Sequence, residues 1–305
     1  MALCKCSDGL SNTGMPTCLA TLPLPDGLYV VNTFDSDGNR NSIEAGTSID
    51  DEYVLDKINE ADKSKRWYPV QKLTNLTSER ADPIIDEASN GVKSFVKEGV
   101  RPFSFELRKG GVSAVKFLKK TRCSEFSVFL VKGSTIIGMD LNDDNTALYP
   151  IRIEQNTFTV KYVFATDTTV EKVSVTFDFD SRENDELLSY IEAEVDLSNY
   201  NGLLDINSTV IGTPGITSFV VKLTTNYGGL GSKDVLSGLE VGDFSLYRTN
   251  NTPASVSISS VSEDPDGTYT FTIPTGTDGD ILRLTPSKVG YDFTSVINKT
   301  ITLVD

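Results

Sequence analysis

Histidine is absent from all 305 residues of this chain, and its absence removes whole classes of chemistry. Histidine is the only side chain whose unperturbed pKa lies in the physiological range, so it supplies most general bases and many metal ligands. Without it, Ser/His and Cys/His nucleophilic pairs are excluded, as are zinc and iron sites that need imidazole. Catalysis by paired carboxylates, lysine or tyrosine stays possible. The composition therefore favours a protein that holds or joins other molecules.

Cysteine is scarce, and its spacing is not typical of a zinc site. Cys4, Cys6 and Cys18 form a C-x-C-x11-C pattern, and Cys123 lies far away in the sequence. A four-cysteine zinc site is conceivable, but the C-x2-C knuckle that usually forms one is missing. We therefore expect free thiols in a reducing cytoplasm, and we predict no metal and no cofactor.

Long apolar runs and basic charge are also lacking. No stretch approaches the roughly 18–20 consecutive apolar residues of a membrane helix, and the first ten residues do not resemble a secretion signal. We expect a protein that is made in a cytoplasm and does not enter a membrane. Lys+Arg 28 against Asp+Glu 43 gives a net charge of −15. Such a surface repels phosphate, which argues against tight nucleic-acid binding but not against a surface past which DNA slides.

We predict that residues 1–90 form an N-terminal arm that contains one helix. Residues 1–49 are rich in Gly, Asn, Ser, Thr and Pro, with one hairpin-like unit at residues 28–38. A helix should follow, because Ser48 and Asp51 form a capping pattern and Val54, Ile58 and Ala61 repeat at i, i+4 and i+7. Residues 73–90 are again polar.

Residues 91–200 alternate between apolar and polar side chains, which indicates strands with one buried face. Such alternation is found at residues 103–108, 158–164 and 173–180, and a hairpin is expected around Gly133. Helices are expected at residues 111–120 and 183–194, the second from an apolar stripe of Leu187, Ile191 and Val195. We predict an antiparallel β barrel or sandwich with a few helices.

Residues 201–305 change in composition, and helical periodicity disappears. Thr, Ser, Gly and Val dominate, and short alternating strands recur at residues 219–225, 243–248, 255–261, 268–273, 280–284 and 300–304. About 100 residues of this kind are typical of an immunoglobulin-like (Ig-like) β-sandwich. The whole chain is therefore predicted to be mainly β.

Three acidic motifs are candidates for chemistry, and each has a simpler interpretation. Asp35, Asp37 and Asn39 begin like a calcium loop, but the sixth and twelfth positions are wrong, and the motif at residues 140–145 fails in the same way. Turns are the better interpretation. Asp178 and Asp180 share one strand face about 7 Å apart, as a glycosidase pair requires. A solvated strand edge is commoner, so we predict no catalytic residue and no enzyme.

The middle of the chain resembles the tail-tube type structural proteins of tailed bacteriophages. The likeness spans residues 89–195 and depends on the order and spacing of its segments. These are residues 92–109, then a lysine-rich helix, then residues 123–131, 147–151 and 173–180. Residues 201–305 resemble the Ig-like modules appended to virion proteins, through residues 266–271 and 280–285. The resemblance implies a hexameric ring that stacks into a tube, contacts other virion proteins, and lets DNA pass without sequence-specific binding. It also implies localisation in the virion.

Other functions remain open at this point. Within a virion, the chain is also compatible with a capsid decoration, head-fibre or connector protein. An adhesin-like binding protein would use the Ig-like block to recognise a glycan or receptor. A carboxylate-based hydrolase would depend on Asp178 or Asp180.

Overall fold

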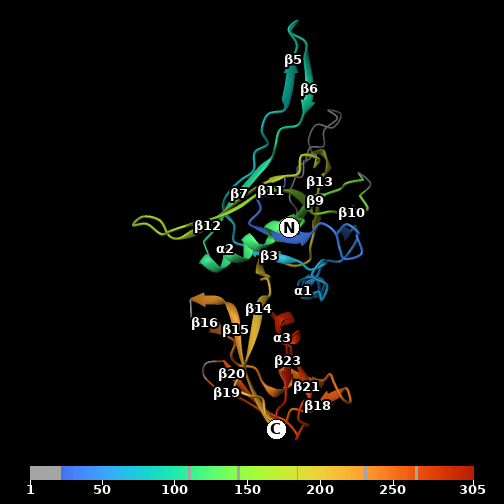
Figure 1. The fold of residues 1–305 in the computed structure, drawn as a ribbon. Helices are drawn as coiled ribbons and strands as arrows, with labels where there is room; N and C mark the ends of the chain where they lie inside the picture. Colours follow the sequence, from blue (N-terminus) through green and yellow to red (C-terminus); the bar gives the residue numbers. More distant parts are fainter. Residues whose placement is uncertain (1–21, 109–110, 143–144, 184, 230–231, 265–266) are drawn as a thin grey trace. The chain divides into compact units, whose positions relative to one another are not determined.

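The chain is mainly β and divides into two compact units, with the boundary between Gly202 and Leu203. The computed structural model describes residues 22–108, 111–142, 145–183, 185–229, 232–264 and 267–305 (Figure 1). Among these residues there are three α-helices: α1 (Asp51–Asn59), α2 (Gly111–Lys120) and α3 (Thr294–Ile297). No helix in these ranges is long and apolar enough to cross a membrane. The predicted fold class is confirmed.

The first unit is built on one open antiparallel sheet with the order β13-β9-β8-β11-β12-β7-β4, in which β1 also pairs with β8 and β3 pairs with β1. Its strands are β1 (Gly27–Asn32), β3 (Tyr68–Gln71), β4 (Thr74–Thr77), β7 (Pro102–Leu107), β8 (Phe126–Lys132), β9 (Thr135–Met139), β11 (Ile151–Val163), β12 (Lys172–Phe179) and β13 (Leu188–Glu192). Two small pairs complete the unit: β2 (Ile43–Glu44) with β10 (Ala147–Leu148), and β5 (Ile84–Glu87) with β6 (Lys93–Lys97).

The predicted alternation produces the core of this sheet. Strand β12 has the burial pattern of an apolar row on one face, and its antiparallel register places Phe177 opposite Phe103 and Val175 opposite Phe105. The rings of Phe103 and Phe177 stack with centroids 5.2 Å apart. Burying each such side chain contributes roughly 1.5–3 kcal/mol, so the cross-strand row is a principal source of stability.

The two longer helices lie close to their predicted positions. Helix α2 has the predicted bounds, and Val115 is its buried residue. Helix α1 buries Val54 and Ile58 but is capped by Asp50, whose Oδ1 accepts a hydrogen bond from the Tyr53 amide at 2.9 Å. Aspartate replaces Ser48 as the cap because it lies immediately before the first helical residue. Ala61 lies beyond the end of the helix.

Two predicted elements of the first unit differ in the structure. In the predicted arm, β1 is a central strand that pairs with both β3 and β8, because its run of Leu28, Tyr29 and Val31 is apolar enough to be buried. Residues 1–21 of that arm lie outside the described residues. The helix predicted at residues 183–194 is wrong: β13 occupies this region and pairs with β9. The helical pattern consists of only three apolar residues, and backbone hydrogen bonds to β9 stabilise the strand instead.

The second unit is a β-sandwich. Its six-stranded sheet has the order β19-β20-β15-β14-β22, with β16 beside β15, and its four-stranded sheet has the order β18-β17-β21-β23. The strands are β14 (Leu204–Ile211), β15 (Ser218–Gly229), β16 (Ser232–Val235), β17 (Phe244–Arg248), β18 (Ala254–Val256), β19 (Ser260–Asp264), β20 (Thr268–Thr272), β21 (Ile281–Pro286), β22 (Tyr291–Asp292) and β23 (Thr300–Thr302).

The core of the sandwich joins its two sheets. Phe219 and Phe271 stack on the larger sheet with centroids 4.9 Å apart, and Phe244 of the smaller sheet meets Phe271 edge-on at 4.9 Å. One predicted strand, at residues 255–261, is divided between β18 and β19, which belong to different sheets. The chain changes sheets there, which a continuous alternating pattern does not reveal. The sequence prediction also missed β14.

Candidate interaction surface

A projecting hairpin is the most unusual feature of the first unit. Strands β5 and β6 form a two-stranded sheet of their own, with Ile85 opposite Phe95 and Glu87 opposite Lys93, and they extend away from the main sheet (Figure 1). Every residue from 81 to 98 is exposed. The turn contains Asn90 and Gly91, and Gly91 has a positive φ of 82°.

The hairpin carries more apolar surface than an isolated ribbon should leave in water. Its exposed fractions are Ile84 49%, Ile85 53%, Val92 57%, Phe95 63% and Val96 54%. An isolated two-stranded hairpin is only marginally stable in water, and the exposed Glu87–Lys93 ion pair at 3.6 Å adds little. Clustered exposed apolar side chains mark interaction sites. The hairpin is therefore a candidate interaction site.

The sequence prediction missed this hairpin because residues 73–90 are polar on average. A local signal was present, since Asn90-Gly91 is a strong hairpin turn and lies between Ile84-Ile85 and Phe95-Val96. The two apolar pairs flank that turn at short spacing. The turn dipeptide and its flanking residues were therefore more informative than the mean composition.

The base of the hairpin is fastened to the main body by an ion-pair network. Arg80 donates two hydrogen bonds to Asp185, at 2.8 and 2.9 Å, and Arg101 donates to the same carboxylate at 2.7 Å. Arg80 also donates to the carbonyl of Gly99 at 2.9 Å. The Arg80 guanidinium lowers the pKa of Asp185, with Arg101 contributing, against the opposing effect of burial. Asp185 is thus charged at neutral pH and links both ends of the hairpin to the residues before β13.

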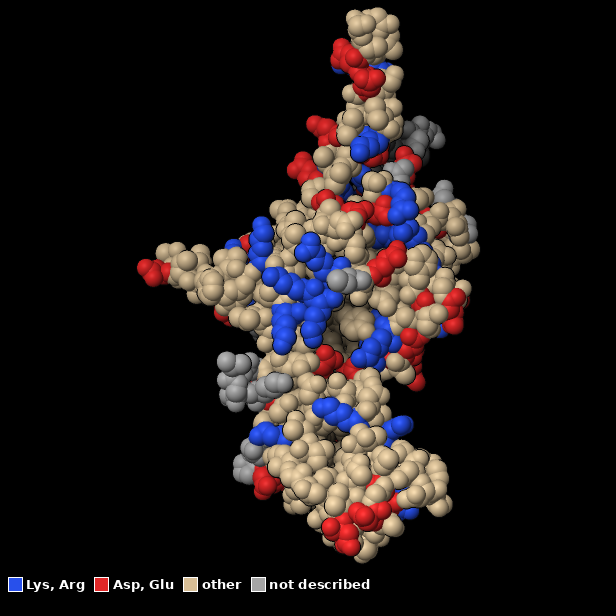
Figure 2. Space-filling view, in the orientation of Figure 1, with Lys and Arg blue, Asp and Glu red and all other residues tan. Residues whose placement is uncertain are grey.

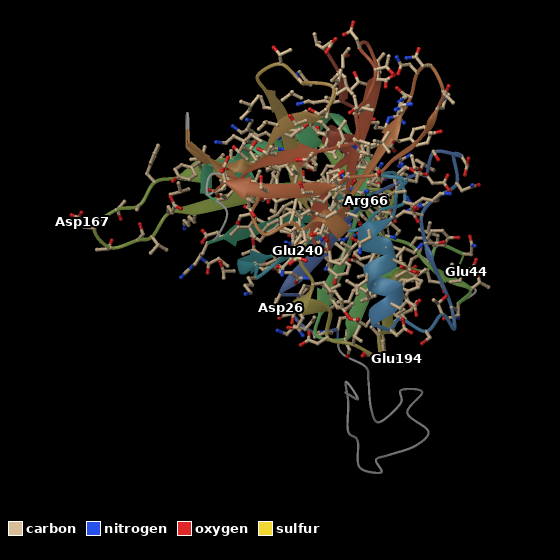
Figure 3. The ribbon with its side chains drawn as sticks, turned by 90° about the horizontal axis from the view of Figure 1, so that it is seen from below. Asp26, Glu44, Arg66, Asp167, Glu194 and Glu240 are labelled. Atoms are coloured by element: carbon tan, nitrogen blue, oxygen red, sulfur yellow. The ribbon has the colours of Figure 1, made fainter. Side chains whose placement is uncertain are left out.

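A second ribbon projects from the same unit. It consists of the ends of β11 and β12 and the loop between them, and Asp167 marks its far end in Figure 3. Phe164 is 76% exposed and Val170 is 61% exposed. Tyr162 donates a hydrogen bond to Glu171, which raises the pKa of the tyrosine. The first unit therefore presents apolar side chains on two extended ribbons.

A cavity of about 380 Å³ adjoins the base network, and its lining is mostly apolar. The apolar lining includes Phe103, Leu130, Ile137, Met139, Ile151 and Phe179. The charged groups that line it are already ion-paired: Arg80 and Arg101 bind Asp185, and Glu183 binds Arg40, which lies outside the lining, at 3.1 Å. This cavity suits an aliphatic or aromatic group better than a polar substrate.

The two carboxylates weighed as a candidate pair lie in different environments. Asp178 is half-buried near the end of β12, whereas Asp180 lies just beyond the strand and is buried. Asp180 accepts a hydrogen bond from Arg182 at 2.6 Å, and this arginine lowers the pKa of the aspartate. A general acid needs a raised pKa, so the environment of Asp180 has the opposite effect.

The two candidate calcium loops form turns. Asp35 Oδ1 accepts the amides of Asp37 and Asn39 at 3.0 and 2.8 Å, and Lys65 Nζ lies 3.6 Å from Asp35 Oδ2. The lysine therefore neutralises the carboxylate that a calcium ion would bind. In the second motif, Asp140 Oδ2 accepts the Asn145 amide at 2.8 Å, while residues 143 and 144 lie outside the described residues.

The cysteines add nothing further to these candidates. Cys4, Cys6 and Cys18 lie outside the described residues, and Cys123 ends a short 3-10 turn (Thr121–Cys123). Within the described ranges, no group of three or more His, Cys, Asp or Glu side chains is placed to hold a metal ion.

Comparison of this chain with protein families, curated proteins and solved structures found no match. The candidate surface is therefore defined by the residues of this chain alone. It consists of the β5–β6 hairpin, its ion-paired base and the β11–β12 ribbon.

Proposed function

We propose that this chain is a virion structural protein, and specifically a tail-tube subunit that stacks as rings around a conduit for phage DNA. The observation that carries the proposal is the β5–β6 hairpin, in which Ile85 and Phe95 face each other across the strands and are more than half exposed. A subunit that assembles with copies of itself needs such a segment, because the apolar surface is buried only in the assembly.

Three further features support the proposal. Residues 89–195 resemble tail-tube proteins in the order of their elements. The net charge of −15 suits a wall that DNA must pass without being held. Asp180, one of the two candidate carboxylates, is ion-paired with Arg182. The second unit is a β-sandwich, and its sequence resembles modules appended to virion proteins.

The test is assembly of the purified full chain, measured by light scattering on a sizing column and by negative-stain microscopy. The wild-type chain should form rings or tubes, and the double variant Ile85→Ser/Phe95→Ser should remain monomeric with unchanged circular dichroism. The control is Val289→Ser, which removes an 82% exposed apolar side chain of the second unit. Wild-type protein that stays monomeric at high concentration, or a hairpin variant that assembles normally, would overturn the proposal.

The same images separate the rival virion roles. A tail-tube subunit should give stacked rings, whereas a capsid decoration or connector protein should give single rings or small closed oligomers. Stacking along one axis is the outcome that the proposal requires.

A further inference from the structure

Positive charge gathers on one side of an otherwise acidic unit. Arg108 follows β7, Lys116, Lys119 and Lys120 lie on α2, and Arg122 lies in the turn after it. All five side chains are exposed, and Figure 2 shows blue side chains clustered over this region. We call these five residues the α2 basic patch.

The α2 basic patch has little compensating charge within its own chain: Arg108 contributes to lowering the pKa of Glu106, although Lys172 is the larger cause. Among the described residues, none of the five forms an ion pair, although Lys120 lies 5.8 Å from the centre of the Phe117 ring. Lys116 and Lys120 are four residues apart on one helix face, where like charges repel. The helix dipole offsets part of this repulsion, because Lys119 and Lys120 lie in the last turn. A cluster of five exposed cations on one surface is complementary to an anionic partner.

The unit carries an acidic face on a different element. On α1, Glu52 and Asp56 are exposed and lie four residues apart. Glu194 accepts a hydrogen bond from Ser48 at 2.5 Å, and its amide donates to the carbonyl of Ile49 at 2.9 Å, just before the helix begins.

Glu44 extends the same acidic face. It is exposed, and it lies near α1: burial raises the pKa of Tyr53 on that helix, and the charge of Glu44 raises it further. Figure 3 shows Glu44 and Glu194 on the α1 side of the unit. We call Glu44, Glu52, Asp56 and Glu194 the α1 acidic face. Helices α1 and α2 lie apart within this unit (Figure 1).

We propose that the α2 basic patch of one copy docks on the α1 acidic face of the next copy, so that subunits join head to tail. This inference rests on the proposed function and names the surfaces involved. Because α1 and α2 lie apart, one subunit can contact a neighbour through each face at the same time. A contact of this kind closes into a ring when its rotation permits, and continues as an open filament when it does not.

Charge reversal tests the proposal directly. Variant one is Lys116→Glu/Lys119→Glu/Lys120→Glu, and variant two is Glu44→Lys/Glu52→Lys/Asp56→Lys. Each alone should fail to assemble, because its two faces then carry the same sign. An equimolar mixture should assemble again, since each variant supplies the partner that the other lacks at both faces. Recovery on mixing also shows that both variants are folded.

Salt supplies a second readout. Wild-type assembly should weaken by about tenfold or more between about 50 mM and 500 mM NaCl, because added ions screen exposed charges. The control variant Arg283→Glu reverses an exposed charge in the second unit and should assemble like wild type.

The outcomes separate this inference from the proposed function. If variant one assembles normally while the hairpin variant does not, the docking surface is wrong and the structural role stands. If the mixture stays monomeric although each variant melts cooperatively, docking of the α2 basic patch on the α1 acidic face of another copy is wrong. If variant one loses binding to a fluorescent DNA duplex but keeps its assembly, the α2 basic patch is a nucleic-acid site and the proposal is overturned.

Discussion

Replacing Gly99 by alanine should open the base of the β5–β6 hairpin while the rest of the first unit stays folded. An added Cβ would lie 1.9 Å from the Ala81 carbonyl oxygen, 2.5 Å from the Ala81 carbonyl carbon and 2.6 Å from the Asp82 carbonyl oxygen. All three atoms belong to the backbone, so the two chain segments must separate. The bond from the Ala81 amide to the Val100 carbonyl, 2.9 Å long, would then be lost.

The size of the effect follows from the packing. Inserting a methyl group into a filled position costs about 1–3 kcal/mol. At about 2 kcal/mol, the local opening equilibrium shifts by roughly 30-fold, because about 1.4 kcal/mol corresponds to a factor of ten. The cost is confined to the hairpin, since an isolated ribbon contributes little to global stability and opens before the main sheet unfolds.

Hydrogen exchange with mass spectrometry measures this change. Peptides covering residues 82–98 should exchange roughly 30-fold faster in Gly99→Ala, whereas peptides covering β12 should be unchanged, and assembly should fall in parallel. The matched control is Gly242→Ala, because a Cβ there meets nothing within 4 Å. Unchanged exchange at residues 82–98, or equal acceleration in β12, would refute the reasoning.

Three other predictions concern stability. Asp185→Asn should cost about 0.5–1 kcal/mol at pH 7, since Asp185 is charged beside Arg80. Because the folded pKa of Asp185 is depressed, this difference in unfolding free energy should begin to shrink below the ordinary pKa of aspartate and disappear below the folded pKa, as urea titrations at neutral and strongly acidic pH would show. Phe177→Ala and Phe271→Ala should each cost about 3–5 kcal/mol, measured by urea unfolding, with the loss confined to the unit that carries the change. Tyr29→Phe should cost about 1–2 kcal/mol, because its buried hydroxyl donates to a backbone carbonyl at 2.8 Å; a melting temperature equal to wild type would contradict this.

Much of the fold follows from patterns that lie within a single element. The alternation in β12, the bounds of α2 and the change in composition near residue 200 all reflect local burial, so they were predictable. The predictions that failed concern residues whose pairing partners lie far away in the sequence. Residues 188–192 form a strand and not the predicted helix because β9 pairs with them along its edge.

The sequence by itself determined the mainly β composition, the lack of imidazole chemistry, the surplus of acid and the position of the lysine-rich helix. These are properties of residue type and spacing, and they need no knowledge of neighbours. Only the tertiary structure decided that β1 is central, that residues 81–98 project as an exposed ribbon, and that Arg80 and Arg101 converge on Asp185. Burial and ion pairing between residues far apart depend on where the whole chain places them, and no local pattern records that placement.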